Sequence, residues 1–304
     1  MDNFNTLSID NKPVKWMTIN GRIVYSTTPD YTAAVTASMN DAIGAATAST
    51  GTYVPPGDSA AYSYTLYTDS VPEVPFTEQG SGSTKPFAIA PHVFVRAKHY
   101  GGTVSTFQLS GTTYTVKEQV ALSAWCEANN VAVPAGCGDI ELLYTNEAMD
   151  SSVVPCLMSK LMMQGLFYRD AIKGEVGYCA TQVSGRGQPV VFTNNKSNGV
   201  LRWSTPNMLA SLLPDEEYTT NIKAAPATYL GTGGDSGKPV FVQMASNQVV
   251  VSHNWQIEKP AFSPTAPYFM TGPDYTIAFP ALKAYIESKG DEVKIPTLAN
   301  ESGN

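Results

Sequence analysis

A glycine-rich segment near residue 236 has the clearest chemical character in the sequence. Residues 231–241 are Gly-Thr-Gly-Gly-Asp-Ser-Gly-Lys-Pro-Val-Phe. A serine hydroxyl becomes a good nucleophile when a base takes its proton and backbone N–H groups face the oxygen that becomes charged. The small residues around Ser236 allow a tight turn, in which the N–H groups of Gly234 and Ser236 can form an oxyanion hole. The segment predicts a nucleophilic serine, and the alternative is a glycine-rich turn with an incidental serine.

The same segment does not fit a phosphate-binding loop. Such a loop needs a glycine, four further residues and then Gly-Lys-Ser/Thr at the start of a helix. With Gly237-Lys238 as the pair, the leading position holds Thr232 instead of glycine. The final position holds Pro239, and the residues that follow it have the pattern of a strand. We therefore exclude a phosphate-binding loop here.

The base for this serine must be one of 3 histidines. His92 lies within a predicted strand, and His253 directly follows one. His99 ends a strand and comes just before the turn at Gly101-Gly102. Catalytic side chains are commonly placed on loops at the ends of strands. We therefore predict that His99 is the base, and the alternative is an ordinary surface histidine.

The third member of such a site is a carboxylate that fixes the imidazole tautomer and stabilises the charged ring. Of the acidic residues between His99 and Ser236, only Asp139 lies directly before a strongly apolar strand, residues 140–144. A carboxylate at the mouth of a buried strand can be held out of water. We therefore predict Asp139 as the acid, and a turn-capping aspartate is the alternative.

Two successive runs of short strands must position these residues. Alternating apolar and aromatic residues bounded by turn residues predict strands over residues 86–90, 92–96, 103–108, 112–116, 140–144, 175–182, 188–193, 199–203, 239–244 and 248–252. Two runs of this kind favour an all-β fold of two packed β-barrels. A helix that begins at Pro280 and ends at Gly290 is expected near the C-terminus.

The chain is expected to have four parts. They are an N-terminal extension (1–72), a first barrel with His99 and Asp139 (73–150), a second barrel with Ser236 (151–290) and a loose tail (291–304). Within the extension, apolar spacing predicts a helix over 30–48 and alternation predicts a strand over 62–67.

Composition excludes several classes of protein. The chain has 304 residues, of which 43% are apolar and 15% charged, and its net charge is -7. These values are typical of a folded domain, and an acidic chain lacks the basic surface of a general nucleic-acid binder. No apolar run reaches the ~20 residues of a membrane span, and the first residues lack the pattern of a secretory signal. The 4 cysteines have no CxxC spacing and no histidine at zinc spacing, so we expect reduced thiols in a cytoplasm-like compartment and no metal.

Three segments together resemble the signature segments of chymotrypsin-like serine proteases. They are Ala-Lys-His at 97–99, Gly-Asp-Ile-Glu-Leu-Leu at 138–143 and Gly-Asp-Ser-Gly at 234–237. The order His, Asp, Ser matches that family, and the separations of 40 and 97 residues suit its fold. The resemblance covers residues 76–290. It implies two antiparallel six-stranded β-barrels with a C-terminal helix, peptide-bond cleavage through an acyl-enzyme, and no cofactor.

The departures from the family pattern point to a subgroup. Secreted members have a cysteine directly after the catalytic histidine and another four residues before the serine, where this chain has Tyr100 and Thr232. The chain is therefore more similar to the polyprotein-processing proteases of positive-strand RNA viruses, which implies a site in the host cytoplasm and its own polyprotein as a substrate. An intracellular bacterial or phage protease is the alternative source. Residues 22–24, Arg-Ile-Val, are expected to be an ordinary strand and not a zymogen activation site.

The resemblance also bears on which peptide bonds are cut. In the family, the residue six before the serine lies at the base of the pocket for the side chain that precedes the cut, and here it is Leu230. A preference for a non-basic residue is implied. In viral members a histidine placed like His253 selects Gln or Glu, but those members usually have threonine where this chain has Gly231, with Thr232 one residue later. The alternatives are an apolar pocket at Leu230 and a His253 whose hydrogen bonds are satisfied within its strand.

A function of another class remains open at this point. A protease fold does not guarantee activity, so a catalytically silent homologue that serves as a binding or capsid module is the second hypothesis. The intact triad favours the enzyme, and the long N-terminal extension suits the binding module.

Overall fold

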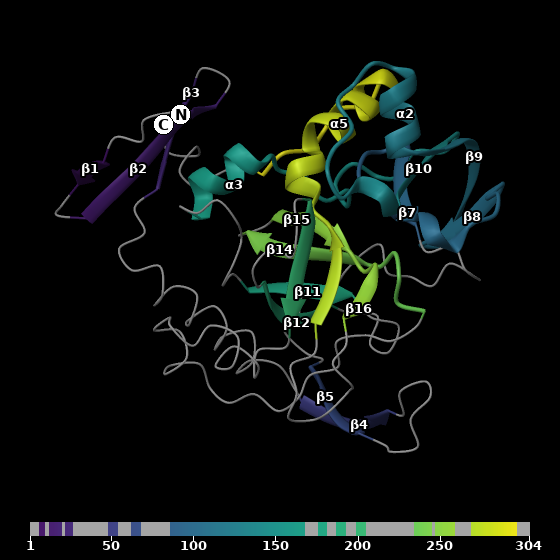
Figure 1. Cartoon of the computed structure of the whole chain (residues 1–304), viewed down its shortest axis with the longest axis horizontal. Coiled ribbons are helices and arrows are strands. Elements are labelled where there is room, and N and C mark those ends of the chain that lie inside the picture. Colours follow the sequence, from purple (N-terminus) through teal and green to yellow (C-terminus); the bar gives the residue numbers. More distant parts are fainter. Residues whose placement is uncertain are drawn as a thin grey trace.

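The computed structural model of the chain describes residues 6–9, 12–19, 22–26, 48–53, 62–67, 86–167, 176–180, 187–192, 199–204, 234–244, 247–258 and 269–296. In these residues most of the regular structure is strand, arranged in four antiparallel sheets (Figure 1). The prediction of a mainly β protein is confirmed for this part of the chain.

Among the described residues before 86 there are five strands. They are β1 (Thr6–Ile9), β2 (Lys12–Ile19), β3 (Arg22–Ser26), β4 (Ala48–Tyr53) and β5 (Tyr62–Tyr67). The first three form one sheet and the last two another. β3 and β5 lie where the sequence predicts strands. The helix expected over 30–48 falls outside the described residues as far as residue 47, and residue 48 begins β4.

The first of the two larger sheets has five strands in the order β6-β7-β10-β9-β8. They are β6 (Phe87–Ala88), β7 (Val93–Ala97), β8 (Thr106–Leu109), β9 (Thr112–Ala121) and β10 (Ile140–Thr145). The sheet is curled, and a register shift at Tyr144/Thr145 interrupts the β9–β10 pairing. Such bulges increase the local bend and twist of a sheet. The turn between β8 and β9 has positive φ at Ser110 and Gly111.

The second large sheet has seven strands in the order β15-β14-β11-β12-β13-β17-β16. They are β11 (Val176–Ala180), β12 (Gly187–Phe192), β13 (Val200–Ser204), β14 (Pro239–Met244), β15 (Asn247–His253), β16 (Gln256–Glu258) and β17 (Phe269–Pro273). The first five lie where the sequence predicts strands. β16 and β17 were not predicted.

The apolar runs in β14 and β15 are explained by burial on both faces of the sheet. Successive side chains of a strand point to opposite faces. Phe241 and Val250 belong to the apolar core that contains the first sheet, whereas their neighbours Val240, Val249 and Val251 belong to a second core within the second sheet. One face of the second sheet therefore contributes to the same core as the first sheet.

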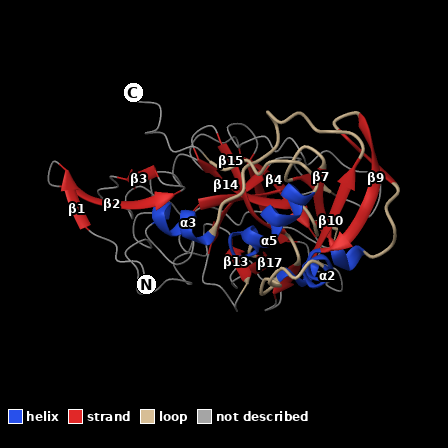
Figure 2. Cartoon of the chain, turned by 90° about the horizontal axis from the view of Figure 1, so that it is seen from above, coloured by secondary structure: helices blue, strands red, loops and turns tan. Residues whose placement is uncertain are grey.

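The helical segments of the described residues are short except for the last. They are η1 (Lys98–Tyr100), α2 (Leu122–Ala128), η2 (Cys137–Asp139), α3 (Lys160–Phe167) and α5 (Tyr275–Ser288). In Figure 1, α5 extends from the second sheet near β15 toward α2 beside the first sheet, and Figure 2 also shows it near α2. Its buried residues belong to the same core as those of the first sheet. On the side of the first sheet its Tyr285 packs edge-on against Trp125 of α2, with ring centroids 5.3 Å apart.

The start predicted for the C-terminal helix is wrong. α5 begins at Tyr275 because the Asp274 carboxylate caps it, accepting hydrogen bonds from the backbone nitrogens of Thr276 and Ile277. Pro280 lies inside the helix and not at its first position. An aspartate cap outweighs the preference of proline for the first turn. The predicted end is confirmed, since the helix stops just before Gly290, whose φ is +83°.

The expectation of a loose tail is wrong for residues 291–296. The Asp291 carboxylate accepts hydrogen bonds from the backbone nitrogen of His92 at 2.7 Å and contacts its ring Nδ1 at 2.9 Å. The Lys294 ammonium donates to the carbonyl of Val154 at 2.9 Å. These polar contacts fix the segment against the body of the protein. Residues 297–304 lie outside the described part.

Candidate active site

His99 and Asp139 meet because of the register between two neighbouring strands. Ala97, the last residue of β7, is the partner of Ile140, the first residue of β10, in their antiparallel pair. His99 lies in the turn that follows the first strand, and Asp139 lies in the turn that precedes the second. The pairing therefore brings two residues that are 40 positions apart to one edge of the sheet.

The Asp139 carboxylate holds His99 through two of its groups. Its Oδ1 accepts a hydrogen bond from the backbone nitrogen of His99 at 2.9 Å, and its Oδ2 lies 2.9 Å from the ring Nδ1. The side chain of Asp139 is 3% exposed, whereas that of His99 is 39% exposed. A buried carboxylate thus fixes the orientation of a ring that remains open to solvent.

A buried arginine holds the turn that follows His99. The guanidinium of Arg96 donates to the carbonyl oxygens of Gly101 at 2.9 Å and Gly102 at 2.8 Å. Its Nε is paired with the carboxylate of Glu141, the cross-strand partner of Arg96. Gly101 has a φ of +61°, which favours glycine. The His99 turn is therefore fixed from both ends, by Asp139 and by Arg96.

Ser236 lies in a tight turn that precedes β14. Gly234 and Gly237 on either side of it have φ of 102° and 80°, so the turn depends on glycine at both positions. The backbone nitrogen of Gly237 donates to the carbonyl of Asn254 at 2.8 Å, and the backbone nitrogen of Asn254 donates to the carbonyl of Lys238 at 2.9 Å. The turn is thereby tied to the end of β15.

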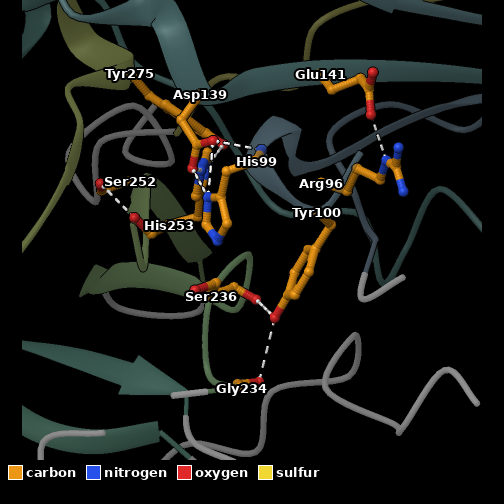
Figure 3. A network of polar contacts seen from close by, with 10 residues as sticks. All are labelled: Arg96, His99, Tyr100, Asp139, Glu141, Gly234, Ser236, Ser252, His253 and Tyr275. Atoms are coloured by element: carbon orange, nitrogen blue, oxygen red, sulfur yellow. Dashed lines mark hydrogen bonds and ion pairs between the residues drawn. The ribbon is translucent and has the colours of Figure 1, made fainter. Parts of the chain in front are cut away.

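The structure places Ser236 on the side of the His99 ring away from Asp139. Figure 3 shows the ring between the carboxylate and the serine, with one ring nitrogen pointing toward Ser236. Both residues are described, and no hydrogen bond joins them. The described residues thus show His99 joined to Asp139, with Ser236 beside the ring and no hydrogen bond between the ring and the serine.

Tyr100 connects the histidine turn to the serine turn. Its hydroxyl donates to the carbonyl of Ser236 at 2.9 Å and more weakly to that of Gly234 at 3.4 Å (Figure 3). These contacts use carbonyl oxygens and not the N–H groups of Gly234 and Ser236 that an oxyanion hole requires. In the sequence, Tyr100 stands out only as a departure from the secreted proteases, and its position next to His99 was the available signal.

A second histidine lies on the buried side of Asp139. The ring of His253 is fully buried, with Nε2 at 3.3 Å from Asp139 Oδ2 and Nδ1 at 2.6 Å from the hydroxyl of Tyr275. His253 is the cross-strand partner of Pro239, three residues after Ser236, so it belongs to the same end of the second sheet. The ring faces the carboxylate and is not exposed to solvent. That position agrees with the alternative of a histidine satisfied inside the fold, not with a side chain that contacts substrate.

Burial and hydrogen bonds together set the charges of this buried group. Burial alone raises the pKa of Asp139, but the hydrogen bond from His253 and the contacts with His99 outweigh it and hold that pKa below its ordinary value. Burial lowers the pKa of His253 in spite of the neighbouring carboxylate. Burial also raises the pKa of Tyr275 well above its ordinary value. At neutral pH the group therefore contains an anionic carboxylate beside a neutral imidazole and a neutral phenol.

Two of the predicted substrate-contact residues, Leu230 and Thr232, lie outside the described residues. Tyr275 was missed by sequence analysis, because nothing in the sequence relates the first residue of a helix to an aspartate more than a hundred positions earlier.

No protein-family model and no curated protein matches the chain. Among the described residues, no group of three or more His, Cys, Asp or Glu side chains is arranged to hold a metal ion. No helix in that part of the chain is long and apolar enough to cross a membrane.

Proposed function

We propose that the chain is a serine endopeptidase in which Ser236 is the nucleophile, His99 the base and Asp139 the acid. The observation that carries the proposal is the pair of contacts from the buried Asp139 to the backbone and ring of His99, with Ser236 on the opposite side of the ring. Peptide cleavage by such a site begins when the serine oxygen attacks the carbonyl carbon while the imidazole accepts its proton. The imidazolium then protonates the leaving amine, and water releases the acyl group by the reverse sequence.

Each neighbouring group has a definite part in this mechanism. Asp139 stays ionised, holds the ring and stabilises its positive charge. The N–H groups of Gly234 and Ser236 stabilise the negative oxygen of the tetrahedral intermediate. The fold that goes with this function is two six-stranded antiparallel barrels, and a curled five-stranded sheet beside a second antiparallel sheet is compatible with it.

The proposed substrate is a polypeptide cut after a non-basic residue, in the manner of a viral polyprotein. In the resembling family the residue six before the serine forms the base of the pocket, and Leu230 at that sequence position would favour an aromatic or aliphatic side chain. Selection of Gln or Glu is the other possibility. The four cysteines are all buried and none of them is joined in a disulfide, which suits a reducing compartment such as the host cytoplasm. A peptide-library cleavage profile distinguishes these preferences.

The direct test is covalent labelling by a fluorophosphonate probe. The wild-type protein should be labelled at Ser236, and Ser236→Ala should abolish the labelling. Ser105→Ala is the matched control, because Ser105 is an exposed serine of the first sheet region, and it should be labelled like the wild type. Persistent labelling of Ser236→Ala would refute Ser236 as the nucleophile.

A catalytically silent homologue that serves as a binding or capsid module is the second candidate. The absence of a hydrogen bond between the described residues His99 and Ser236 favours it. A folded wild-type protein that resists the probe would select this candidate or a protease that cuts only itself. Mapping both termini of protein expressed with added flanking sequence separates these two, because only the self-cutting protease removes its flanks.

A further inference from the structure

Two further polar side chains, His253 and Tyr275, lie on the buried side of Asp139. A site made of a serine, a histidine and an aspartate does not need them for its basic chemistry. Tyr275 contacts Nδ1 of His253 at 2.6 Å, and Nε2 of His253 contacts Asp139 at 3.3 Å. Oδ2, the oxygen that faces His253, also faces Nδ1 of His99. One carboxylate oxygen is thus shared between two imidazole rings, one exposed and one buried (Figure 3).

The directions of these hydrogen bonds follow from the charges. An ionised carboxylate only accepts, so Nε2 of His253 must carry the proton that it donates to Asp139. A neutral imidazole has one protonated nitrogen, so Nδ1 of His253 must accept from the hydroxyl of Tyr275. Each contact therefore has one consistent donor, in the order Tyr275, His253, Asp139.

Packing fixes the position of the His253 ring. Its backbone is paired with Pro239 at the start of β14. Gly272 lies so close that a Cβ there would be 1.9 Å from the carbonyl oxygen of His253. Tyr275 is held at the first turn of α5 by the Asp274 cap. The backbone on both sides of the ring thus leaves it facing Asp139.

We propose that His253 and Tyr275 are positioning residues of the site: Tyr275 fixes the Nε2–H tautomer of His253, and His253 holds the Asp139 carboxylate in the orientation that engages His99. The proposal rests on the serine-peptidase function proposed above. In this proposal His253 acts through Asp139 and does not contact the substrate, because its ring is fully buried and both of its nitrogens are engaged.

The first test reads the tautomer and needs no activity. The chain has 3 histidines, so their ring signals in a 15N-histidine-labelled protein can be assigned with single variants. We expect one ring with protonated Nε2 and bare Nδ1 at neutral pH, which disappears in His253→Gln and loses its fixed tautomer in Tyr275→Phe. The groups that face this ring are Asp139, Tyr275 and the more distant His99. An Nδ1–H tautomer, or a ring that averages between tautomers in the wild type, would overturn the proposal.

The second test separates positioning from substrate contact. His253→Leu removes the donor to Asp139. Loss of a hydrogen bond to a charged group should lower the rate of fluorophosphonate labelling about ten- to a hundredfold. His253→Gln keeps an amide donor near the position of Nε2 and should retain most of the rate. Tyr275→Phe should lower it about two- to tenfold. His92→Gln is the matched control, because the His92 ring also contacts an aspartate, Asp291. This variant should label at the wild-type rate.

The outcomes distinguish this inference from the proposed function. A wild-type protein that does not react with the probe refutes the peptidase function and the positioning role that rests on it. A reactive wild type with equally reactive His253→Leu and Tyr275→Phe overturns the positioning role alone. An altered peptide-library profile in His253→Gln at an unchanged labelling rate also overturns it, in favour of a substrate contact. If His253→Leu does not fold, Tyr275→Phe and His253→Gln still decide.

Discussion

Removal of one hydroxyl group tests whether Tyr100 holds the serine turn. The Tyr100 hydroxyl donates at 2.9 Å to the carbonyl of Ser236, and it reaches the carbonyl of Gly234 only at 3.4 Å. Burial raises the pKa of Tyr100, so the hydroxyl keeps its proton and remains a donor through neutral pH. Tyr100→Phe keeps the ring and deletes this donor, and nothing else in the site changes its chemistry.

The expected loss of stability in Tyr100→Phe follows from the lengths of the two hydrogen bonds and the burial of Ser236. A neutral hydrogen bond contributes about 0.5–1.5 kcal/mol net. The second contact lies near the limit of hydrogen-bond length and adds little. Because Ser236 is half-buried, water can replace the lost donor in part, so we expect a loss of about 1 kcal/mol in the free energy of unfolding. If the same contact holds the turn during acylation, labelling slows about fivefold.

Two assays and one control variant test whether the Tyr100 hydroxyl holds the serine turn. Urea unfolding gives the change in stability, and the rate of fluorophosphonate labelling gives the change at the site. Tyr144→Phe is the control, because Tyr144 is a half-buried tyrosine of β10 and no hydrogen bond of its hydroxyl is found in the described residues. A Tyr100→Phe protein that labels at the wild-type rate would show that the hydroxyl does not hold the turn. A loss of stability above about 3 kcal/mol would show that more than one hydrogen bond was removed.

Three further perturbations test the buried polar groups around the site. Asp139→Asn should slow labelling by about 10⁴-fold, because the neutral amide no longer stabilises the charged ring; a labelling rate within tenfold of wild type would contradict this. Arg96→Met should cost about 3–5 kcal/mol in urea unfolding because it leaves Glu141 buried without its partner, and the double variant with Glu141→Leu should recover part of the loss. His253 is held neutral by burial in the folded chain, while the unfolded chain protonates it as the pH falls through its ordinary pKa of 6.5. The stability of the wild type should therefore decrease below about pH 6.5, by at most ~1.4 kcal/mol per pH unit from this group, and His253→Gln should show a shallower decrease, whereas equal slopes would assign the pH dependence to other groups.

The parts of the fold that sequence predicts are those decided locally. β14 has the predicted bounds, Pro239–Met244, because a proline opens an apolar run that both faces of the sheet bury. β10 follows Asp139 as predicted, since an apolar run directly after a polar turn has few other solutions. The contact between His99 and Asp139 could be anticipated for the same reason, because polar residues at the ends of buried strands lie at the edges of a sheet.

The missed features depend on contacts that are distant in the sequence. α5 starts at Tyr275 because of a side-chain cap by Asp274, which outweighs the proline signal at Pro280. His253 was singled out, but the spacing to Ser236 does not show which face of β15 carries its ring. That face is set by the pairing with Pro239 and by the helix that places Tyr275 against it.

The site also shows why its two halves must be assembled together. Asp139 lies in the turn before β10 of the first sheet, and it accepts hydrogen bonds from His99, in the turn after β7, and from His253 of the second sheet. A buried carboxylate is costly unless several donors satisfy it, so part of the stabilisation of Asp139 exists only when the two sheets are docked. The Tyr100 hydroxyl adds a second link, from the first sheet to the serine turn of the second. A change that loosens the contact between the sheets should therefore weaken two interactions at the same time, the hydrogen bond between Asp139 and the His99 ring and the hydrogen bond from Tyr100 to Ser236.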